Sequence, residues 1–198
     1  MRDAGELLEA WARGDSEALG ELLQRHLPGL RGFIRLRMGG LLRSKEDSGD
    51  LVQSVCREIL QHGDRFRHPS EEGFRRWLYT TALRKVMNRA QHYRAARRDA
   101  ALEVPADSPA AEAELLDCYG SFCTPSRVVA AREEVARIEA LFEELPADYR
   151  EVITLARIAR LSRAAIAGEM GRTEKAVRDL LYRAEARLAE LLSRKGLR

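Results

Sequence analysis

The chain has 198 residues, of which 45% are hydrophobic and 33% are charged, and its formal net charge is only +3. This length suits one or two small domains, and this composition is typical of a folded protein. No apolar run approaches the roughly 20 residues of a membrane-spanning helix, and the N-terminus lacks the apolar core of a signal peptide. We therefore expect a cytoplasmic protein without a membrane segment. Three cysteines, an odd number, fit a reducing compartment.

Helical periodicity dominates the first part of the chain. Two helices are expected over residues 5–43, with Asp15 as the N-cap of the second and a break at Pro28–Gly29. Asp47 or Ser48 can cap the next helix, whose apolar residues recur every three or four positions. A further helix follows from Phe74.

The charges are sorted along the chain. Residues 74–98 contain eight Lys or Arg, no Asp or Glu, and four aromatic residues, whereas residues 99–124 contain six acidic residues and no basic one. A basic, aromatic helix is typical of a nucleic-acid surface, because cations hold phosphates and aromatic faces stack on bases. A solvated face is the alternative, although such faces usually mix both signs. Trp77 is compatible with either a core position or a DNA contact.

Residues 99–127 are rich in Pro, Ala, Ser and acidic residues, which is the composition of a linker. Fully extended, these residues reach roughly 95 Å at about 3.3 Å each. Helical patterns resume after them, and no strand pattern occurs in the sequence. The sequence thus predicts an all-α fold in which two small helical domains, residues 1–98 and 128–198, are joined by a flexible acidic linker.

A helix-turn-helix is predicted near the C-terminus. Ser162 suits the N-cap of its first helix, Gly171 the tight turn, and Thr173 the N-cap of the second helix, which in such motifs enters the major groove. An ordinary pair of antiparallel helices is the alternative. Asp179 and Glu174 would repel phosphates unless they face away or accept a hydrogen bond from a cytosine. The side chains that the second helix offers to DNA are Arg172, Thr173, Lys175, Arg178 and Arg183.

These segments, in this order, resemble the extracytoplasmic-function (ECF) sigma factors, the minimal initiation factors of the bacterial sigma-70 type. The resemblance spans nearly the whole chain and rests on "DLVQ" at 50–53, "FRRWLY" at 74–79 with its basic helix, the acidic linker and the helix-turn-helix. It implies that the first domain binds the minus-ten element and the clamp of the largest subunit of core RNA polymerase. The second domain would read the minus-thirty-five element and meet the flap of the second-largest subunit. An anti-sigma protein is a further candidate partner.

The resemblance also assigns roles to single residues. The expected polymerase contacts are Asp47, Asp50, Gln53 and Arg57. The expected contacts with minus-ten DNA are Trp77, Arg84, Lys85, Asn88, Arg89 and Gln91, and Asn88 falls where the family often has Asn or Asp against a base. The sequence departs from the family at Gly49 and at Asp179–Leu180, where a polar residue and a basic residue are common.

Melting of the minus-ten region has a physical basis in base capture. Stacking on an aromatic side chain contributes about 1–3 kcal/mol per base, which is comparable to the mean cost of about 1.4 kcal/mol for one duplex step. We expect a pocket for a flipped base in the loop 67–74, with a plain surface loop as the alternative. The acidic linker is expected to imitate RNA phosphates in the RNA channel of polymerase, and a solubilising tether is the alternative.

No catalytic constellation, phosphate-binding loop or complete metal-ligand set occurs in the sequence. Cys118 and Cys123 have no His or third Cys nearby, and Cys56 falls in an apolar stripe. We therefore expect no enzyme activity, cofactor or metal. The predicted function is a transcription initiation factor that binds core polymerase, directs it to promoters and helps to melt the minus-ten region. The alternatives are a stand-alone helix-turn-helix regulator with an N-terminal sensing or dimerisation domain, and an RNA-processing enzyme.

Overall fold

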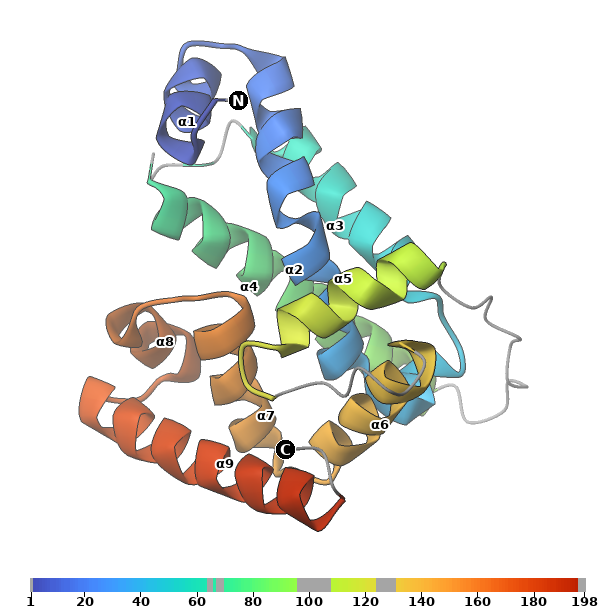
Figure 1. Ribbon diagram of the computed structural model, residues 1–198. Coiled ribbons are helices and arrows are strands. Elements are labelled where there is room, and N and C mark those ends of the chain that lie inside the picture. The colour runs from blue at the N-terminus through green and yellow to red at the C-terminus, as the bar shows by residue number, and fades with distance from the viewer. Residues whose placement is uncertain (1, 64–65, 67–69, 96–107, 124–130, 196–198) are drawn as a thin grey trace.

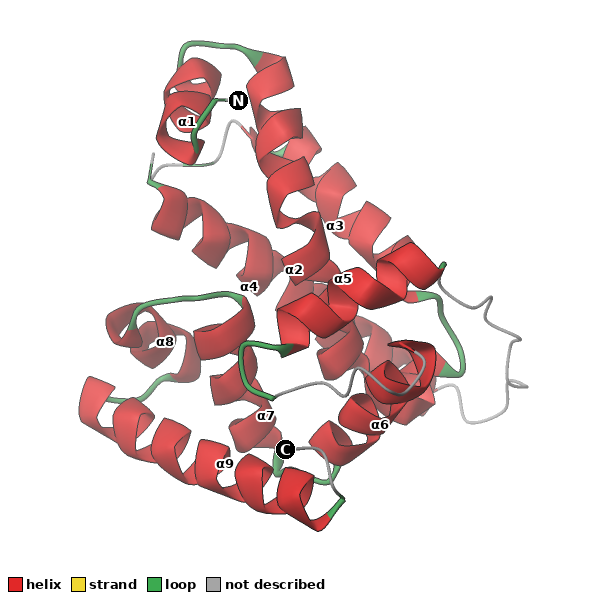
Figure 2. Ribbon diagram, viewed as in Figure 1, coloured by secondary structure: helices red, strands yellow, loops and turns green. Residues whose placement is uncertain are grey.

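The computed structural model describes residues 2–63, 66, 70–95, 108–123 and 131–195. All regular elements within these ranges are helices (Figures 1 and 2), which confirms the all-α class. In chain order they are α1 (Ala4–Ala12), α2 (Ser16–Arg43), α3 (Ser48–Gln61), α4 (Glu71–Ala95), α5 (Pro109–Tyr119), α6 (Ala131–Glu143), α7 (Ala147–Ile153), the π-helical turn η2 (Thr154–Ile158), α8 (Arg163–Met170) and α9 (Glu174–Arg194).

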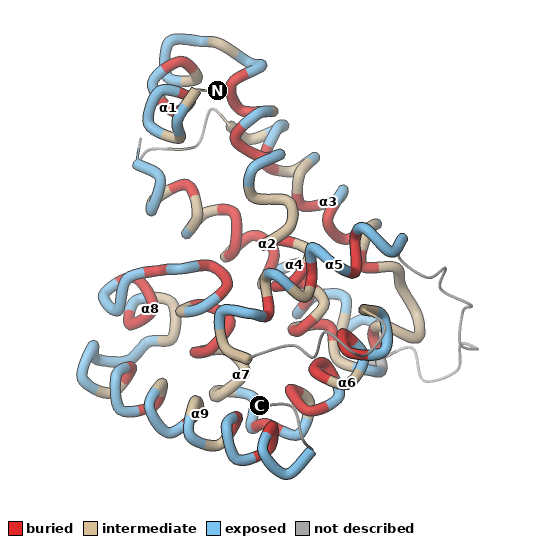
Figure 3. Tube along the Cα trace, in the orientation of Figure 1, coloured by how far each residue is buried: buried red, intermediate tan, exposed pale blue. Residues whose placement is uncertain are grey.

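Helix α2 is the centre of the N-terminal half, which comprises α1 to α4. It packs against α1, α3 and α4, and Figure 3 shows buried positions along the sides where these helices meet. Leu22 and Phe33 of α2, Leu51 of α3 and Phe74 of α4 are all buried. Full burial of such a side chain contributes about 1.5–3 kcal/mol. The apolar stripes predicted from the sequence therefore form one shared core.

The starts of the first helices follow from local capping. The carboxylate of Asp15 accepts hydrogen bonds from the backbone N–H groups of Glu17 and Ala18, at 3.0 Å and 3.3 Å, which confirms Asp15 as an N-cap. Asp47 caps α3 in the same way, and its Oδ1 accepts from the N–H of Gly49 at 2.8 Å. Such caps typically stabilise a helix by about 1 kcal/mol.

The break predicted at Pro28–Gly29 is wrong. Pro28 lies inside α2, and the departure from helical geometry comes later, at Gly39, where φ is 66° and ψ is 165°. Gly29 serves helix packing, because a Cβ atom there would lie 2.5 Å from the hydroxyl of Tyr79 on α4. Proline removes one backbone hydrogen bond from the helix. The core contacts along α2 offset this loss, and these contacts cannot be read from the residues next to Pro28.

The segment predicted as a linker contains a helix that the sequence analysis did not anticipate. Helix α5 begins after Ser108, whose hydroxyl accepts from the N–H of Ala111 at 3.3 Å, with Pro109 in the first turn. Leu115 and Tyr119 are fully buried, and α5 packs against both α2 and α6 (Figure 1). Helix α5 has only a few apolar residues, so its periodicity does not stand out in a segment rich in Pro, Ala and acidic residues. The rest of the predicted linker, residues 99–107 and 124–127, lies outside the described residues.

The C-terminal half comprises α6 to α9, and it is joined to the N-terminal half by a buried ionic cluster. Glu139 of α6 is only 3% exposed. Its carboxylate accepts hydrogen bonds from Arg35 Nε at 2.6 Å and Nη2 at 3.0 Å, and from the Tyr119 hydroxyl at 2.8 Å. Arg43 Nη1 lies 3.3 Å from the same carboxylate. Paired, charge-assisted bonds of this kind are among the stronger polar contacts in proteins, and here they hold α2, α5 and α6 together.

Candidate DNA and polymerase interface

The predicted helix-turn-helix is formed by α8 and α9. The Ser162 hydroxyl accepts from the N–H of Ala165 at 3.2 Å, and the Thr173 hydroxyl accepts from the N–H of Ala176 at 3.2 Å. Between the helices, Gly171 is left-handed, with φ 62° and ψ 36°, a conformation that glycine adopts at little cost. The turn and both caps are thus where the sequence signals placed them.

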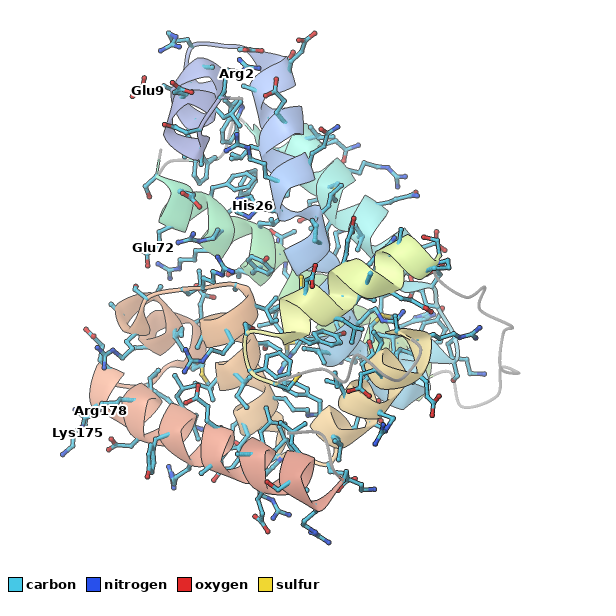
Figure 4. The ribbon with its side chains drawn as sticks, in the orientation of Figure 1. Arg2, Glu9, His26, Glu72, Lys175 and Arg178 are labelled. Atoms are coloured by element: carbon cyan, nitrogen blue, oxygen red, sulfur yellow. The ribbon has the colours of Figure 1, made fainter. Side chains whose placement is uncertain are left out.

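The face of α9 opposite its core side is exposed and cationic. Val177 and Leu180 are buried, which turns the intervening residues outward. Lys175 and Arg178 point away from the protein (Figure 4). All of the predicted DNA contacts on α9 and in the turn before it are exposed: Arg172, Thr173, Lys175, Arg178 and Arg183. The burial of Leu180 explains why this position is apolar here, since its side chain packs in the core instead of facing DNA.

The acidic partners of these cations are themselves exposed. Arg178 Nε lies 3.1 Å from the carboxylate of the adjacent Asp179, and Arg183 Nε donates to the Asp179 carbonyl at 3.2 Å. Arg172 lies 3.4 Å from Asp148. Exposed ion pairs contribute at most about 1 kcal/mol, so DNA can replace them at low cost. The Asp179 carboxylate does not face away from this surface, because it lies beside the Arg178 guanidinium.

The predicted minus-ten surface of α4 has a different environment. Arg84 Nη2 lies 2.9 Å from Glu58 Oε1 on α3, and Lys85 Nζ lies 2.8 Å from Glu58 Oε2. Arg89 Nε lies 3.3 Å from Glu46 Oε1 in the turn before α3. The hydrogen bond from Lys85 is the main cause that lowers the pKa of the Glu58 carboxyl. The fold therefore supplies, from other segments, the carboxylates that the basic block of the sequence lacks.

The remaining α4 candidates divide into exposed and packed side chains. Asn88 and Gln91 are exposed and remain candidates for base contacts. Trp77 is half-buried in an aromatic cluster, with ring centroids 5.3 Å from Phe66, 6.3 Å from Trp11 and 6.3 Å from Phe74. The structure thus gives Trp77 a packing role at the start of α4.

Helix α8 lies against the start of α4. Arg76 Nε donates to Glu169 Oε1 at 2.6 Å, and the N–H of Ser162 donates to Glu72 Oε1 at 3.1 Å. A cavity of about 760 Å³ lies between the two helices, and Trp77 is part of its wall. The loop predicted to hold a flipped base borders this cavity, but its residues 67–69 lie outside the described part of the chain.

The predicted polymerase contacts lie on α3 and its cap. Asp50, Gln53 and Arg57 are exposed, and their spacing of three and four residues places them along one side of the helix. Asp47 is half-buried, and its carboxylate already caps the helix through Gly49. The structure therefore brings three of the four residues together on an open surface and gives Asp47 a local structural role.

Sequence reasoning missed the carboxylates that face the basic helix. Glu58 is 26 residues from Arg84, and Glu169 is 93 residues from Arg76, so no local pattern joins them. The one available signal is positional, because Glu58 precedes the buried Ile59 of α3 by a single residue and thus lies at the border of the apolar stripe.

Two family models match the halves just described. The model "Sigma-70 region 2" matches residues 22–99, and "Sigma-70, region 4" matches residues 136–188. The ECF RNA polymerase sigma factor SigD of Mycobacterium tuberculosis (strain ATCC 25618 / H37Rv) is 32% identical over 194 residues, which are 96% of this chain and 86% of SigD. The chain belongs to the ECF sigma factors. This sigma factor is accordingly a promoter-directing initiation factor of RNA polymerase, as predicted from the sequence.

Other relatives agree in length and fold. The RNA polymerase sigma factor CnrH of Cupriavidus metallidurans is 31% identical over 191 residues, 96% of this chain and 95% of CnrH. The structure of CnrH in complex with the cytosolic domain of CnrY superposes with a TM-score of 0.62 at 26% identity, over 96% of this chain and 98% of that one. RpoE of Bartonella quintana, solved with the anti-sigma factor NepR, shares the fold, with a TM-score of 0.59 at 22% identity over 88% of this chain and 96% of that one.

The described residues offer no group of three or more His, Cys, Asp or Glu side chains that could hold a metal ion. The three cysteines are free and half-buried. Burial raises the pKa of the Cys118 thiol, and it raises that of Cys123 to about 12. Both thiols are therefore poor nucleophiles in this conformation. Within the same residues, none of the helices is both long and apolar enough to cross a membrane.

Proposed function

We propose that this sigma factor binds the polymerase clamp through the exposed side of α3, reads the minus-thirty-five element with α9, and uses α4 to capture and help melt the minus-ten element. In this proposal residues 1–98 and 128–198 act as separate promoter-binding units, and residues 99–127 connect them. The observation that carries it is the exposed cationic face at the start of α9, directly after the left-handed Gly171. No catalytic or cofactor role is assigned, and the site of action is the cytoplasm.

The packing of the two halves suggests that promoter engagement requires them to separate. Two elements about 17 base pairs apart are separated by roughly 58 Å at about 3.4 Å per step, whereas here α8 lies on the start of α4. The contacts between Arg76 and Glu169 are partly exposed, with 50% and 16% of the two side chains accessible. Polymerase, an anti-sigma protein or the promoter would each shift the equilibrium between the closed and the separated arrangement of the two halves, by binding one of them better than the other.

The clamp assignment has a direct test. Asp50→Arg should leave the fold intact, because Asp50 is exposed, and should weaken binding to core polymerase in a titration by at least tenfold. Glu9→Arg is the matched control, since Glu9 is 77% exposed on α1 and undergoes the same change of charge. Equal affinities of the Asp50→Arg and Glu9→Arg proteins would show that α3 does not bind the clamp.

A second experiment separates an initiation factor from a stand-alone regulator. The proposal predicts that the isolated protein binds duplex promoter DNA weakly in a gel shift, because the two halves are closed on each other. Addition of core polymerase should produce a specific complex and transcripts that start at a defined distance from both elements. Tight, sequence-specific binding without polymerase would favour the regulator.

A further inference from the structure

A second, smaller cavity of about 320 Å³ lies where the two halves of the protein meet. Its walls come from α1, α2, α4 and α5, from the turn after α5, and from η2 with the turn that follows it. Figure 4 shows His26 on the α2 side, facing the region between α2 and α4. The described lining residues are Ala4, Arg25, His26, Gly29, Glu71, Arg75, Tyr79, Asp117, Cys118, Ser121, Arg157, Ile158 and Arg160.

The lining is cationic, with four arginines against two carboxylates. Two of the arginines are neutralised, since Arg75 Nη1 lies 2.9 Å from Glu71 and Arg157 Nε lies 2.6 Å from Glu185. Among the described residues, Arg25 and Arg160, which are both exposed, have no hydrogen-bond or ion-pair partner. Two unpaired guanidinium groups at one small cavity favour an anionic ligand.

Two polar groups in the same wall also lack partners. The Nε atom of Arg75 is buried without a hydrogen bond. Tyr79 is 2% exposed, and its hydroxyl has no hydrogen-bond partner among the described residues. Burial raises the pKa of this hydroxyl, which therefore stays protonated and can donate. Arg75 Nε is too deeply buried to reach a ligand, whereas the Tyr79 hydroxyl is a free donor on the wall of the cavity. Donors on buried side chains are normally satisfied, so this hydroxyl favours a ligand with an acceptor group.

The backbone of Arg160 adds a third observation. Arg160 has a φ of 51°, the only positive value at a non-glycine residue in the described ranges. It directly follows the C-cap of η2, Ala159, at a position where glycine is the usual choice because a side chain there costs about 1–2 kcal/mol. Arginine at a strained position beside the cavity suggests a use for its side chain.

We propose that this cavity binds a small phosphate-bearing anion, which bridges the N-terminal half through Arg25 and Tyr79 to the C-terminal half through Arg160. Arginine forks match phosphate oxygens, and the Tyr79 hydroxyl donates to the same group. The volume lies at the lower end of small-molecule sites, which suits orthophosphate, pyrophosphate or the phosphates of a nucleotide. The site is independent of which residues read the promoter.

Calorimetric titration of the full chain with pyrophosphate tests the proposal, with sodium chloride at matched ionic strength as the blank. We expect saturable binding of one pyrophosphate per chain. Arg160→Gly should weaken it at least tenfold without loss of stability, because glycine suits the left-handed backbone. Tyr79→Phe should weaken it by roughly fivefold and leave unliganded stability unchanged, since its hydroxyl has no partner to lose.

Two further variants control for charge. Asp117→Asn should strengthen binding, because it removes a negative charge from the wall. Arg13→Ala removes an exposed arginine at the end of α1 and should leave the affinity unchanged. Equal weakening by Arg13→Ala and Arg160→Gly, or no effect of Arg160→Gly, would overturn the site and indicate non-specific binding of anions.

Orthophosphate and GTP titrations distinguish a free inorganic phosphate from a nucleotide as the ligand. Tighter binding of GTP than of pyrophosphate, with the same sensitivity to Arg160→Gly, would support a nucleotide as the ligand. Because the ligand joins both halves, saturating pyrophosphate should also raise the melting temperature of the unmodified protein but not of Arg160→Gly. An equal rise in both proteins would contradict the bridging role.

Discussion

Helices α4 and α9 are both rich in cations, yet they differ in what surrounds those cations. On α4, Arg84 and Lys85 face the partly buried Glu58 of α3, and Arg89 faces Glu46. The first turns of α9 instead project Lys175 and Arg178 into solvent (Figure 4), with acidic neighbours that are equally exposed.

The difference shows that a basic stretch of sequence does not by itself define a ready DNA surface. On the α9 surface, Arg172 and Arg178 would exchange the exposed carboxylates of Asp148 and Asp179 for DNA. The α4 cations would have to give up Glu58 and Glu46, which are less exposed, and this would lower their net contribution to binding. We therefore expect α9 to supply most of the affinity for duplex DNA and α4 to act once polymerase has rearranged its surroundings.

The largest predicted effect is a loss of stability when the buried ion-pair cluster around Glu139 is broken. Glu139→Ala leaves Arg35, Arg43 and the Tyr119 hydroxyl without their shared acceptor, and loss of one member of such a buried pair costs about 3–5 kcal/mol. Urea unfolding should show a loss near the lower limit, because both arginines retain partial access to water. Glu190→Ala, on the exposed side of α9, is the control and should cost less than about 1 kcal/mol. Similar losses of unfolding free energy in Glu139→Ala and Glu190→Ala would show that a buried ion pair stabilises this protein no more than an exposed one.

The next largest predicted effect is a loss of promoter affinity when Arg178 of α9 is replaced. Arg178→Ala should weaken holoenzyme binding to the promoter by about 1–3 kcal/mol if Arg178 reads a base. Arg187→Ala, farther along α9 and paired with Glu190, is the matched control and should have little effect. The measurement is promoter binding with intact and scrambled minus-thirty-five elements. If scrambling and Arg178→Ala both leave binding unchanged, α9 does not read this element.

A smaller effect is expected from release of the α4 cations. Glu58→Gln removes the charge that holds Arg84 and Lys85, so promoter affinity should rise by up to about 1 kcal/mol. The dependence of log affinity on log salt concentration should steepen by about one as one more phosphate is neutralised. Glu9→Gln removes the same charge from an exposed position on α1 and is the control that should leave the affinity unchanged. A Glu58→Gln protein with unchanged salt dependence would show that these cations do not reach DNA.

The smallest effect separates base selection from phosphate binding on α4. Asn88 is exposed, and its amide can both donate to and accept from a base edge. Asn88→Ala should relax the preference at one minus-ten position and leave the salt dependence nearly unchanged. Arg84→Ala should weaken all promoters alike and reduce the salt slope by about one. Initiation from a minus-ten library at two salt concentrations measures both; an unaltered base preference in Asn88→Ala would make Asn88 a plain surface residue.

The candidate site was predictable where its signals are local. Ser162, Gly171 and Thr173 lie within twelve residues of one another, and each acts through its own backbone or the next turn, so their roles follow from the chain alone. The exposed side of α3 was predictable for the same reason, since helical spacing decides which residues share a face. Asp47 was predicted both as a possible N-cap and as a polymerase contact; the structure confirms the cap, and the contact stays a prediction.

What the sequence determined by itself is therefore the helical class, the helix-turn-helix, the sorting of charge and the membership of a family whose motifs occur in this order. The tertiary structure alone decided which cations are neutralised, that α5 packs within the linker-like segment, and that Pro28 remains inside α2. It also decided that Arg25, Tyr79 and Arg160 meet around one cavity. The physical reason is distance along the chain: caps, turns and periodicity act within a few residues, whereas ion pairs, core contacts and cavities join side chains that only the packing of helices brings together.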